Sequence, residues 1–276
     1  MRYYHLFRQE KTTVFSFDFR YRNDIVVTDR IFGSFGSKRE SQASTQRLEY
    51  HLAGDLFVSR LATNNARNIV CAHASCRKVD FKVNSKPHDQ IVALLPKSIE
   101  QFPIVAILSP TEVFSSFLVL PSESLSHGIL IKFLTLCQLS IPYPPEPSFN
   151  STESDTFGRY TAKYLQQKGN HPIFTKKRDR YIYSPVNQAQ GNFRTKIQTE
   201  DKIRIDLVKN GETITLSCIT RVISQQALTT EESTRGTLRY RSEKSLSNSE
   251  RKMVLDHLSS RNRVEQMPWV PVPVNN

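Results

Sequence analysis

The sequence contains little glycine, and this shortage excludes several common kinds of enzyme. Only 9 of its 276 residues are glycine, and it has neither a glycine-rich phosphate-binding loop nor a GxSxG nucleophile elbow. Those motifs need glycine because the backbone there turns sharply or approaches a phosphate closely. The sequence therefore argues against a P-loop enzyme and against a dinucleotide-binding enzyme.

Cysteine is scarce as well. Four cysteines are too few and too scattered for a disulfide framework in a chain of this length, which favours a reducing compartment. Cys71, His73 and Cys76 lie close enough in sequence to be zinc ligands, with His88 downstream. No second CxxC-type pair accompanies them, so buried cysteines are the simpler interpretation. The other two cysteines are Cys137 and Cys218.

Long apolar segments are also missing. The longest, residues 128–139, is interrupted by Lys132 and Gln138 and is too short to span a bilayer. The first residues, MRYYHLFRQEK, lack the apolar core of a secretory signal. We therefore expect a protein without a transmembrane segment, located inside the cell in the cytoplasm or the nucleus.

What the sequence has in excess is positive charge. It contains 38 Lys and Arg against 26 Asp and Glu, a formal net charge of +12, and its hydrophobic content of 38% is typical of a folded protein. Basic surfaces bind polyanions because they release the counterions condensed on a phosphate backbone. The charge predicts nucleic acid, DNA or RNA, as the partner; a basic surface that only maintains solubility is the alternative.

Strand-like and helix-like patterns both occur in the first half. Residues 13–21 alternate between aromatic and polar side chains, which predicts a half-buried strand, and a short strand follows at 24–28. Residues 45–62 carry leucines four apart and predict a helix with Glu49 at the edge of its buried side. Further strands are expected at 68–72, 78–83, 90–95, 104–108 and 114–120, followed by a helix at 125–139.

Residues 140–155 hold four prolines within six positions and predict a semi-rigid linker. Beyond it we expect a helix at 156–168, a hairpin turn at Asn210–Gly211, a polar mobile loop at 225–245 and a helix that begins at the capping box Ser247–Glu250. Strands are expected at 173–174, 181–183, 193–197, 203–208 and 213–219.

These patterns predict an α/β or α+β fold, with a mixed central sheet flanked by helices and a second, β-rich α+β domain. The expected divisions are an α/β domain at 1–139, the proline-rich linker at 140–155, a basic β-rich domain at 156–260 and an extended tail at 261–276.

Within the first domain, three features stand in a suggestive order: Glu49 on the expected helix, the apolar strand NIVCA, and the strand VDFKV, in which Asp80 and Lys82 share one face. This order resembles the PD-(D/E)XK nuclease superfamily over residues 41–139. The later FLVLPSESL is similar to the strand and helix that end such domains. The resemblance implies a Mg²⁺-dependent endonuclease that hydrolyses phosphodiester bonds.

By that resemblance, Asp80 would be the metal carboxylate, Lys82 the catalytic lysine and Glu49 a helper. In the family, two carboxylates hold a metal that activates water, and the lysine orients that water or stabilises the developing charge. The sequence departs from the pattern at Asn68, where the family has an acid, because an amide is a poorer Mg²⁺ ligand. A degenerate site is therefore one interpretation. A surface pair on an exposed strand is the other interpretation of Asp80 and Lys82.

Basic residues interleaved with tyrosine in the second half suit phosphate contacts and base stacking. We therefore carry three hypotheses. The first is a nucleic-acid-binding protein with a PD-(D/E)XK-like nuclease site, and the second is a non-enzymatic basic protein of the viral structural or movement type that binds nucleic acid or builds an assembly. The third is an adaptor that binds a partner through the proline-rich linker and the tail. The candidate nucleic-acid-binding residues are Lys176, Lys177, Arg178, Arg180, Tyr181, Arg194, Lys196, Arg239 and Arg241.

Overall fold

The structure is a computed structural model. It describes residues 2–4, 8–28, 43–62, 68–101, 103–108, 114–119, 128–131, 134, 141–143, 146–155, 158–168, 173–183, 196–208, 211–223, 228–259 and 264–266.

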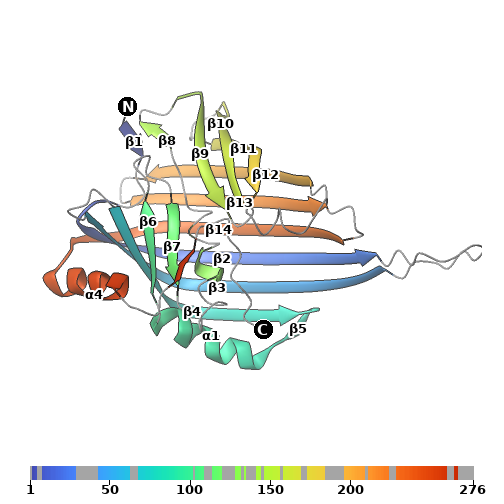
Figure 1. The fold of residues 1–276 in the computed structure, drawn as a ribbon, viewed down its shortest axis with the longest axis horizontal. Coiled ribbons are helices and arrows are strands. Elements are labelled where there is room, and N and C mark those ends of the chain that lie inside the picture. Colours follow the sequence, from blue (N-terminus) through green and yellow to red (C-terminus); the bar gives the residue numbers. More distant parts are fainter. Residues whose placement is uncertain are drawn as a thin grey trace, which may run out of the picture.

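Most of the described chain belongs to one large antiparallel sheet of 13 strands (Figure 1). Two short strands, β1 (Arg2–Tyr4) and β8 (Ile141–Tyr143), pair with each other outside it. The strands of the large sheet are β2 (Lys11–Thr28), β3 (Ala43–Ala62), β4 (Asn68–Val83), β5 (Lys86–Pro87), β6 (Ile104–Leu108), β7 (Phe114–Val119), β9 (Ser148–Asp155), β10 (Gly158–Gln166), β11 (Ile173–Tyr183), β12 (Lys196–Val208), β13 (Gly211–Ile223), β14 (Leu228–Ser245) and β15 (Val264–Gln266).

The strand order is β15-β7-β6-β4-β3-β2-β14-β13-β12-β11-β10-β9, with β5 added beside β4. The long strand β14 lies between β2 and β13 and pairs with both along most of its length. Strands from both sides of residues 140–155 thus share one sheet, and β9 itself lies wholly within the stretch expected to be a linker. The division of the chain into domains at that stretch stays a prediction.

The expected fold class, a mixed sheet flanked by helices, is wrong. Every strand pairing among the described residues is antiparallel. Helices are few in the described chain: α1 (Asp89–Gln101), α4 (Asn248–Ser259) and helical residues at 128–131 and 134. Two of the segments expected to be helices are long strands of the sheet instead.

The error at residues 45–62 has a simple geometric cause. Leucines four apart fall on one face of a helix, but four is also a multiple of the two-residue period of a strand. In β3 the buried residues Tyr50, Leu52, Leu56 and Val58 alternate with more exposed neighbours, as a half-buried strand requires. The expected helix at 156–168 is wrong for the same reason, because Tyr160 and Tyr164 are buried in β10 on a period of two.

Two other segments were also assigned the wrong type. Residues 90–95, an apolar run expected to be a strand, belong to α1. Residues 225–245, expected to be a mobile loop, hold the whole of β14, a mostly polar strand that pairs with its neighbours on both sides. The expected strand at 13–21 is confirmed within β2, and β12 and β13 pair as an antiparallel hairpin. Of the turn expected at Asn210–Gly211, Asn210 lies outside the described residues and Gly211 pairs with Val208 as the first residue of β13.

One face of the sheet carries the core, and the aromatic row of β2 lies in it. Phe15, Phe17, Phe19 and Tyr21 are buried there, and the α1 residue Leu95 joins the same cluster. We call the opposite face of β2, β3, β4 and β14, which carries Arg20 and its polar neighbours, the outer face. A second apolar cluster packs under α4, with members Leu61, Ile69, Cys71, Val105, Leu118, Leu246 and Val254.

A bulge between β3 and β4 decides which β4 side chains reach the outer face. The register passes from Ala53 opposite Lys78 to Gly54 opposite Cys76, so Arg77 is skipped. Ala74 is buried before the bulge and Phe81 after it, which shows that the buried positions change from even to odd numbers. The even-numbered residues Asp80 and Lys82 therefore lie on the outer face.

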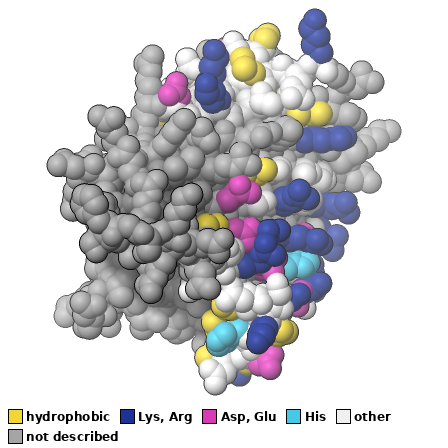
Figure 2. Space-filling model, turned by 90° about the vertical axis from the view of Figure 1, so that its right-hand side faces the viewer, with side chains coloured by type: hydrophobic (Ala, Val, Ile, Leu, Met, Phe, Trp, Pro, Cys, Tyr) yellow, Lys and Arg dark blue, Asp and Glu magenta, His cyan; other side chains and the backbone are white. Residues whose placement is uncertain are grey.

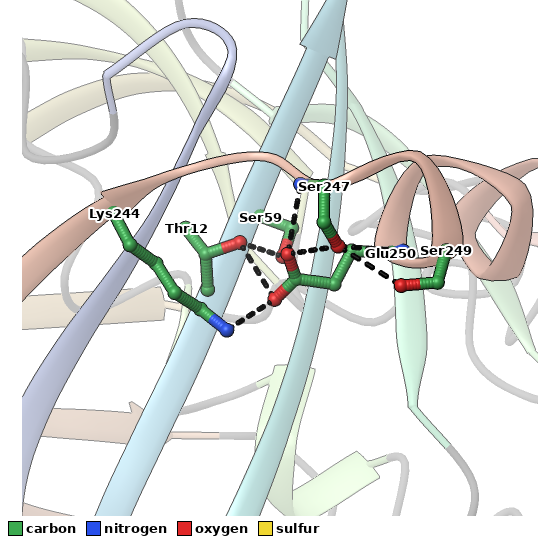
Figure 3. Close-up of polar contacts among 6 residues, drawn as sticks. All are labelled: Thr12, Ser59, Lys244, Ser247, Ser249 and Glu250. Carbon is green, nitrogen blue, oxygen red and sulfur yellow. Dashed lines mark hydrogen bonds and ion pairs between the residues drawn. The ribbon is translucent and has the colours of Figure 1, made fainter.

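Helix α4 is fixed to the sheet by a polar network around Glu250 (Figure 3). The Glu250 amide donates to Ser247 Oγ at 3.2 Å, and the Ser247 amide donates to the Glu250 carboxylate at 2.9 Å, which confirms the predicted capping box. Lys244 Nζ lies 2.7 Å from the same carboxylate. Thr12 donates to it at 3.4 Å and shares a hydrogen bond of 2.9 Å with Ser59. The carboxylate thus links α4 to β14 and β2.

We expect Gly54→Ala to destabilise the protein. A Cβ at Gly54 would lie 1.9 Å from the backbone oxygen of Ser75, so the bulge must deform, at a cost of about 3 kcal/mol. Gly128→Ala is the matched control, because its Cβ meets nothing within 4 Å and alanine favours helix. Urea unfolding of both variants checks this; equal stabilities would contradict the role of the close approach.

We expect Glu250→Gln to lower the free energy of unfolding at neutral pH and to make that free energy depend less on pH in the acidic range. Partial burial favours the protonated form, but Lys244 and Ser247 outweigh it and lower the pKa of Glu250 from 4.5 to about 2. Because the folded-state pKa is depressed, the stabilisation is complete above pH 4.5 and is lost as the pH falls towards 2.

The measurement is urea unfolding at a series of pH values from neutral into this acidic window. The difference in the free energy of unfolding between the wild type and Glu250→Gln should become smaller as the pH falls. Asp256→Asn, at an exposed position of the same helix, is the control and should follow the wild type. A gap that stays constant down to pH 2 would show that the Glu250 charge contributes nothing.

Candidate anion-binding site

A hollow of about 320 Å³ opens on the outer face of β4, β3, β2 and β14. Charged side chains dominate its wall, and its two tyrosines have their rings buried on the other side of the sheet. We call it the basic hollow. Its lining residues are Arg20, Tyr21, Arg22, Glu49, Tyr50, His51, Asp80, Lys82, Ser233 and Arg235.

The strand register explains how residues distant in sequence meet in the basic hollow. Paired residues of neighbouring strands lie about 5 Å apart, so two cross-strand rows build a compact surface. One row runs Asp80, His51, Arg20, Arg235 across the four strands. The next row runs Lys82, Glu49, Arg22, Ser233.

The first row contains a small ionic network centred on His51. His51 Nε2 lies 2.9 Å from Asp18 Oδ2, and its Nδ1 lies 3.8 Å from Asp80 Oδ2. Lys78 Nζ is 3.4 Å from the same Asp80 oxygen, and Arg20 Nε is 3.4 Å from Asp18 Oδ1. Asp80 is half exposed. Its contacts in this network are with His51 and Lys78.

The second row holds one cation that is already neutralised. Arg22 and Arg47 both bind Asp24, at 2.7 and 2.6 Å. Slight burial of Asp24 opposes its ionisation, but the two guanidinium groups outweigh it and lower its pKa. Lys82 and Arg235, in contrast, have no carboxylate within ion-pair distance among the described residues, and both are exposed. These two side chains give the hollow its uncompensated positive charge.

The three residues expected to form a nuclease site do lie in one place. Asp80, Lys82 and Glu49 all line the basic hollow. Glu49, however, reaches it from strand β3 and not from a helix, because the expected helix at 45–62 is wrong. Asn68, the position where the family has an acid, lies at the other end of β4, opposite Ala62.

The arrangement does not fit a Mg²⁺ site well. Within the described residues, no group of three or more His, Cys, Asp and Glu side chains is placed to hold a metal ion. Asp80 instead faces His51 and Lys78. We therefore derive no catalytic step through Mg²⁺, and metal-dependent cleavage stays a prediction. Cys71, Cys76 and Cys218 are free thiols.

Of the basic residues predicted to bind nucleic acid, Lys176 is buried rather than exposed. Its side chain is 4% exposed and its ammonium contacts the fully buried carboxylate of Glu153. Tyr160 and Tyr164 donate to the same carboxylate, and the Lys176 ammonium lies 5.4 Å from each ring centre. This charge is enclosed by its partners and does not face a ligand at the surface.

The remaining predicted residues are dispersed. Arg178 is partly buried, 3.1 Å from Cys218 Sγ and 5.3 Å from the Tyr160 ring centre. Lys177, Arg239 and Arg241 are exposed on β11 and β14 but do not line the basic hollow. Arg180 and Tyr181 of β11 and Lys196 of β12 have side chains outside the described part, and Arg194 lies outside the described residues altogether.

Sequence reasoning missed Arg20, Arg22, His51 and Arg235 as members of a site. The alternation of β2 already indicated that Arg20 lies opposite the aromatic row. Nothing local indicated that β14, some 200 residues later, pairs with β2 and places Arg235 opposite Arg20. Within the described residues, no helix is both long and apolar enough to cross a membrane.

We expect Glu153→Gln to destabilise the fold by about 3–5 kcal/mol, because it leaves the ammonium of Lys176 buried without a counter-charge. The double variant Glu153→Gln/Lys176→Met removes both charges and should recover much of the loss. Urea unfolding of the two single variants and the double variant gives the coupling free energy between the residues. Additive losses would contradict a buried ion pair.

No protein-family model matches the sequence, and no curated protein matches it. Among solved structures, the chain is similar to one titled "Lipid-protein interactions in lipovitellin", with a TM-score of 0.49 and 14% sequence identity. The similarity covers 87% of this chain and 26% of that chain, so this chain spans about a quarter of its length. A likeness of this size does not indicate a shared ligand.

Proposed function

We propose that this protein binds nucleic acid through the phosphate backbone, with the basic hollow as its contact site. The observation that carries the proposal is the pair of exposed cations in the hollow, Lys82 and Arg235, that have no carboxylate within ion-pair distance among the described residues. A cation without an internal partner gains more from a phosphate than one that must first give up a carboxylate.

The surroundings of the hollow support the same proposal. The formal net charge of the chain is +12, and Figure 2 shows Lys and Arg side chains gathered on the described part of the visible face, with acidic and histidine side chains among them. Release of counterions from the phosphate backbone makes such a surface attractive to nucleic acid at moderate salt. An open sheet face also admits a long ligand, whereas an enclosed pocket admits only a small molecule.

Binding without catalysis is the better-supported form of this proposal, because the described residues offer no metal cluster. Cleavage of the bound phosphodiester by Asp80, Lys82 and Glu49 with Mg²⁺ is the second candidate, since all three line the same hollow. An assembly role built on the same basic surface is compatible with the first form.

We expect Lys82→Gln/Arg235→Gln to weaken nucleic-acid binding and to reduce its dependence on salt. Each phosphate contact contributes about 0.9 to the slope of log K against log salt concentration, so the slope should fall by about two. Fluorescence anisotropy with labelled DNA and RNA over a salt series measures both quantities. Lys97→Gln/Lys252→Gln removes the same charge at exposed helical positions away from the hollow and is the matched control.

An affinity that does not change with salt, or an equal loss in the control variant, would overturn the proposal. The same substrates, incubated with Mg²⁺ or Mn²⁺, test cleavage directly. Cleavage by the wild type that is lost in Lys82→Ala would support the nuclease candidate. If neither the wild type nor the variant cleaves the substrate, the nuclease candidate is wrong and binding without catalysis remains.

A further inference from the structure

The basic hollow contains two carboxylates that a surface built only for phosphates would not have. Glu49 is paired across the strands with Lys82 on one side and Arg22 on the other, and Asp80 lies in the neighbouring row beside His51. A carboxylate repels a phosphate at short range and so weakens the binding of any ligand that presents phosphates alone. The pattern of charge suits a ligand that presents a hydrogen-bond donor as well as phosphates.

Both carboxylates have oxygens available to such a donor. Glu49 has no hydrogen bond or ion pair among the described residues, although Arg47 of the same strand interacts with it electrostatically. Asp80 lines the hollow and contacts His51 and Lys78 through Oδ2, which leaves Oδ1 outside these two ion pairs. An ionised carboxylate only accepts hydrogen bonds. A ligand group that reaches these oxygens must therefore present an O–H or N–H donor.

Base stacking cannot supply the specificity at this site. The aromatic side chains of these strands stack on each other on the core face, with ring centres 4.6 Å apart for Tyr21 and Tyr50 and 6.3 Å apart for Tyr50 and Phe81. All three are buried. Because binders of unpaired bases depend on exposed aromatic rings, the hollow reads the sugar and phosphate rather than the base.

We propose that Glu49 and Asp80 select RNA over DNA by accepting hydrogen bonds from ribose 2′-hydroxyl groups, while Lys82 and Arg235 bind the flanking phosphates. The inference rests on the proposed function and deepens it by naming the nucleic acid. The 2′-hydroxyl is the donor that RNA has and DNA lacks, and it lies on the same backbone as the phosphates. Selection by these carboxylates is independent of base sequence.

The test compares three duplexes of one sequence: RNA, DNA, and RNA with 2′-O-methyl groups. The 2′-O-methyl duplex keeps the helix form of RNA but lacks the 2′-hydroxyl donor. With EDTA present, the wild type should bind RNA about tenfold more tightly than DNA, as expected for one hydrogen bond to a charged group. The 2′-O-methyl duplex should bind like DNA. Anisotropy titrations at fixed salt measure all three affinities.

The variants separate the roles within the hollow. In Glu49→Gln/Asp80→Asn, DNA affinity should rise, because the repulsion of phosphate is removed, and the ratio of RNA to DNA affinity should fall towards one. Lys82→Gln should weaken RNA and DNA equally and keep the ratio. Asp256→Asn, an exposed carboxylate on α4, should keep the wild-type ratio. Urea unfolding confirms that each variant is folded.

The outcomes distinguish this inference from the proposed function. Salt-dependent binding with equal affinity for RNA and DNA would overturn the selection and leave nucleic-acid binding intact. A preference that persists in the carboxylate variant, or that needs Mg²⁺, would overturn the role of Glu49 and Asp80 as hydroxyl acceptors. Absence of binding to any duplex would overturn the proposed function itself.

Discussion

The close approach of Gly54 to the backbone of Ser75 is the constraint on which the charged face of the sheet depends. It permits the bulge at Arg77, and the bulge changes which β4 side chains are buried. Without this change, Asp80 and Lys82 would alternate on to the core face, where an unpaired charge is costly. A glycine at this one position thus allows β2, β3, β4 and β14 to build one continuous polar surface.

The sheet separates two kinds of chemistry across the thickness of one backbone layer. Its core face holds the aromatic rings of β2, β3 and β4, while its outer face holds their charged neighbours in sequence. Since side chains of a strand alternate, the same residues that stabilise the fold also fix the spacing of the charges. The buried pair of Glu153 and Lys176 shows that a basic residue of a strand can lie in the interior, where it is neutralised by a partner, instead of on the charged outer face.

Glu49, Asp80 and Lys82, the three residues expected to form a nuclease site, lie together because β3 and β4 are paired strands, and not because a helix packs beside the sheet. Glu49 was expected on a helix beside the sheet, yet it lies on the strand next to β4 and opposite Lys82. The spacing of Asp80 and Lys82 correctly placed both on one strand face. That face also carries arginines from β2 and β14, and among the described residues no group of three His, Cys, Asp or Glu side chains is placed to hold a metal ion.

The sequence by itself determined the local features whose signals extend over a few residues: the buried aromatic row of β2, the capping box that begins α4, and the shared face of Asp80 and Lys82. It could not separate strand from helix at residues 45–62, because a spacing of four satisfies both periods. Only the tertiary structure decided that β14 pairs with β2, that Arg235 therefore lies opposite Arg20, and that Lys176 is buried. These outcomes depend on pairing between segments far apart in the chain, and backbone pairing carries no local signature in the side chains.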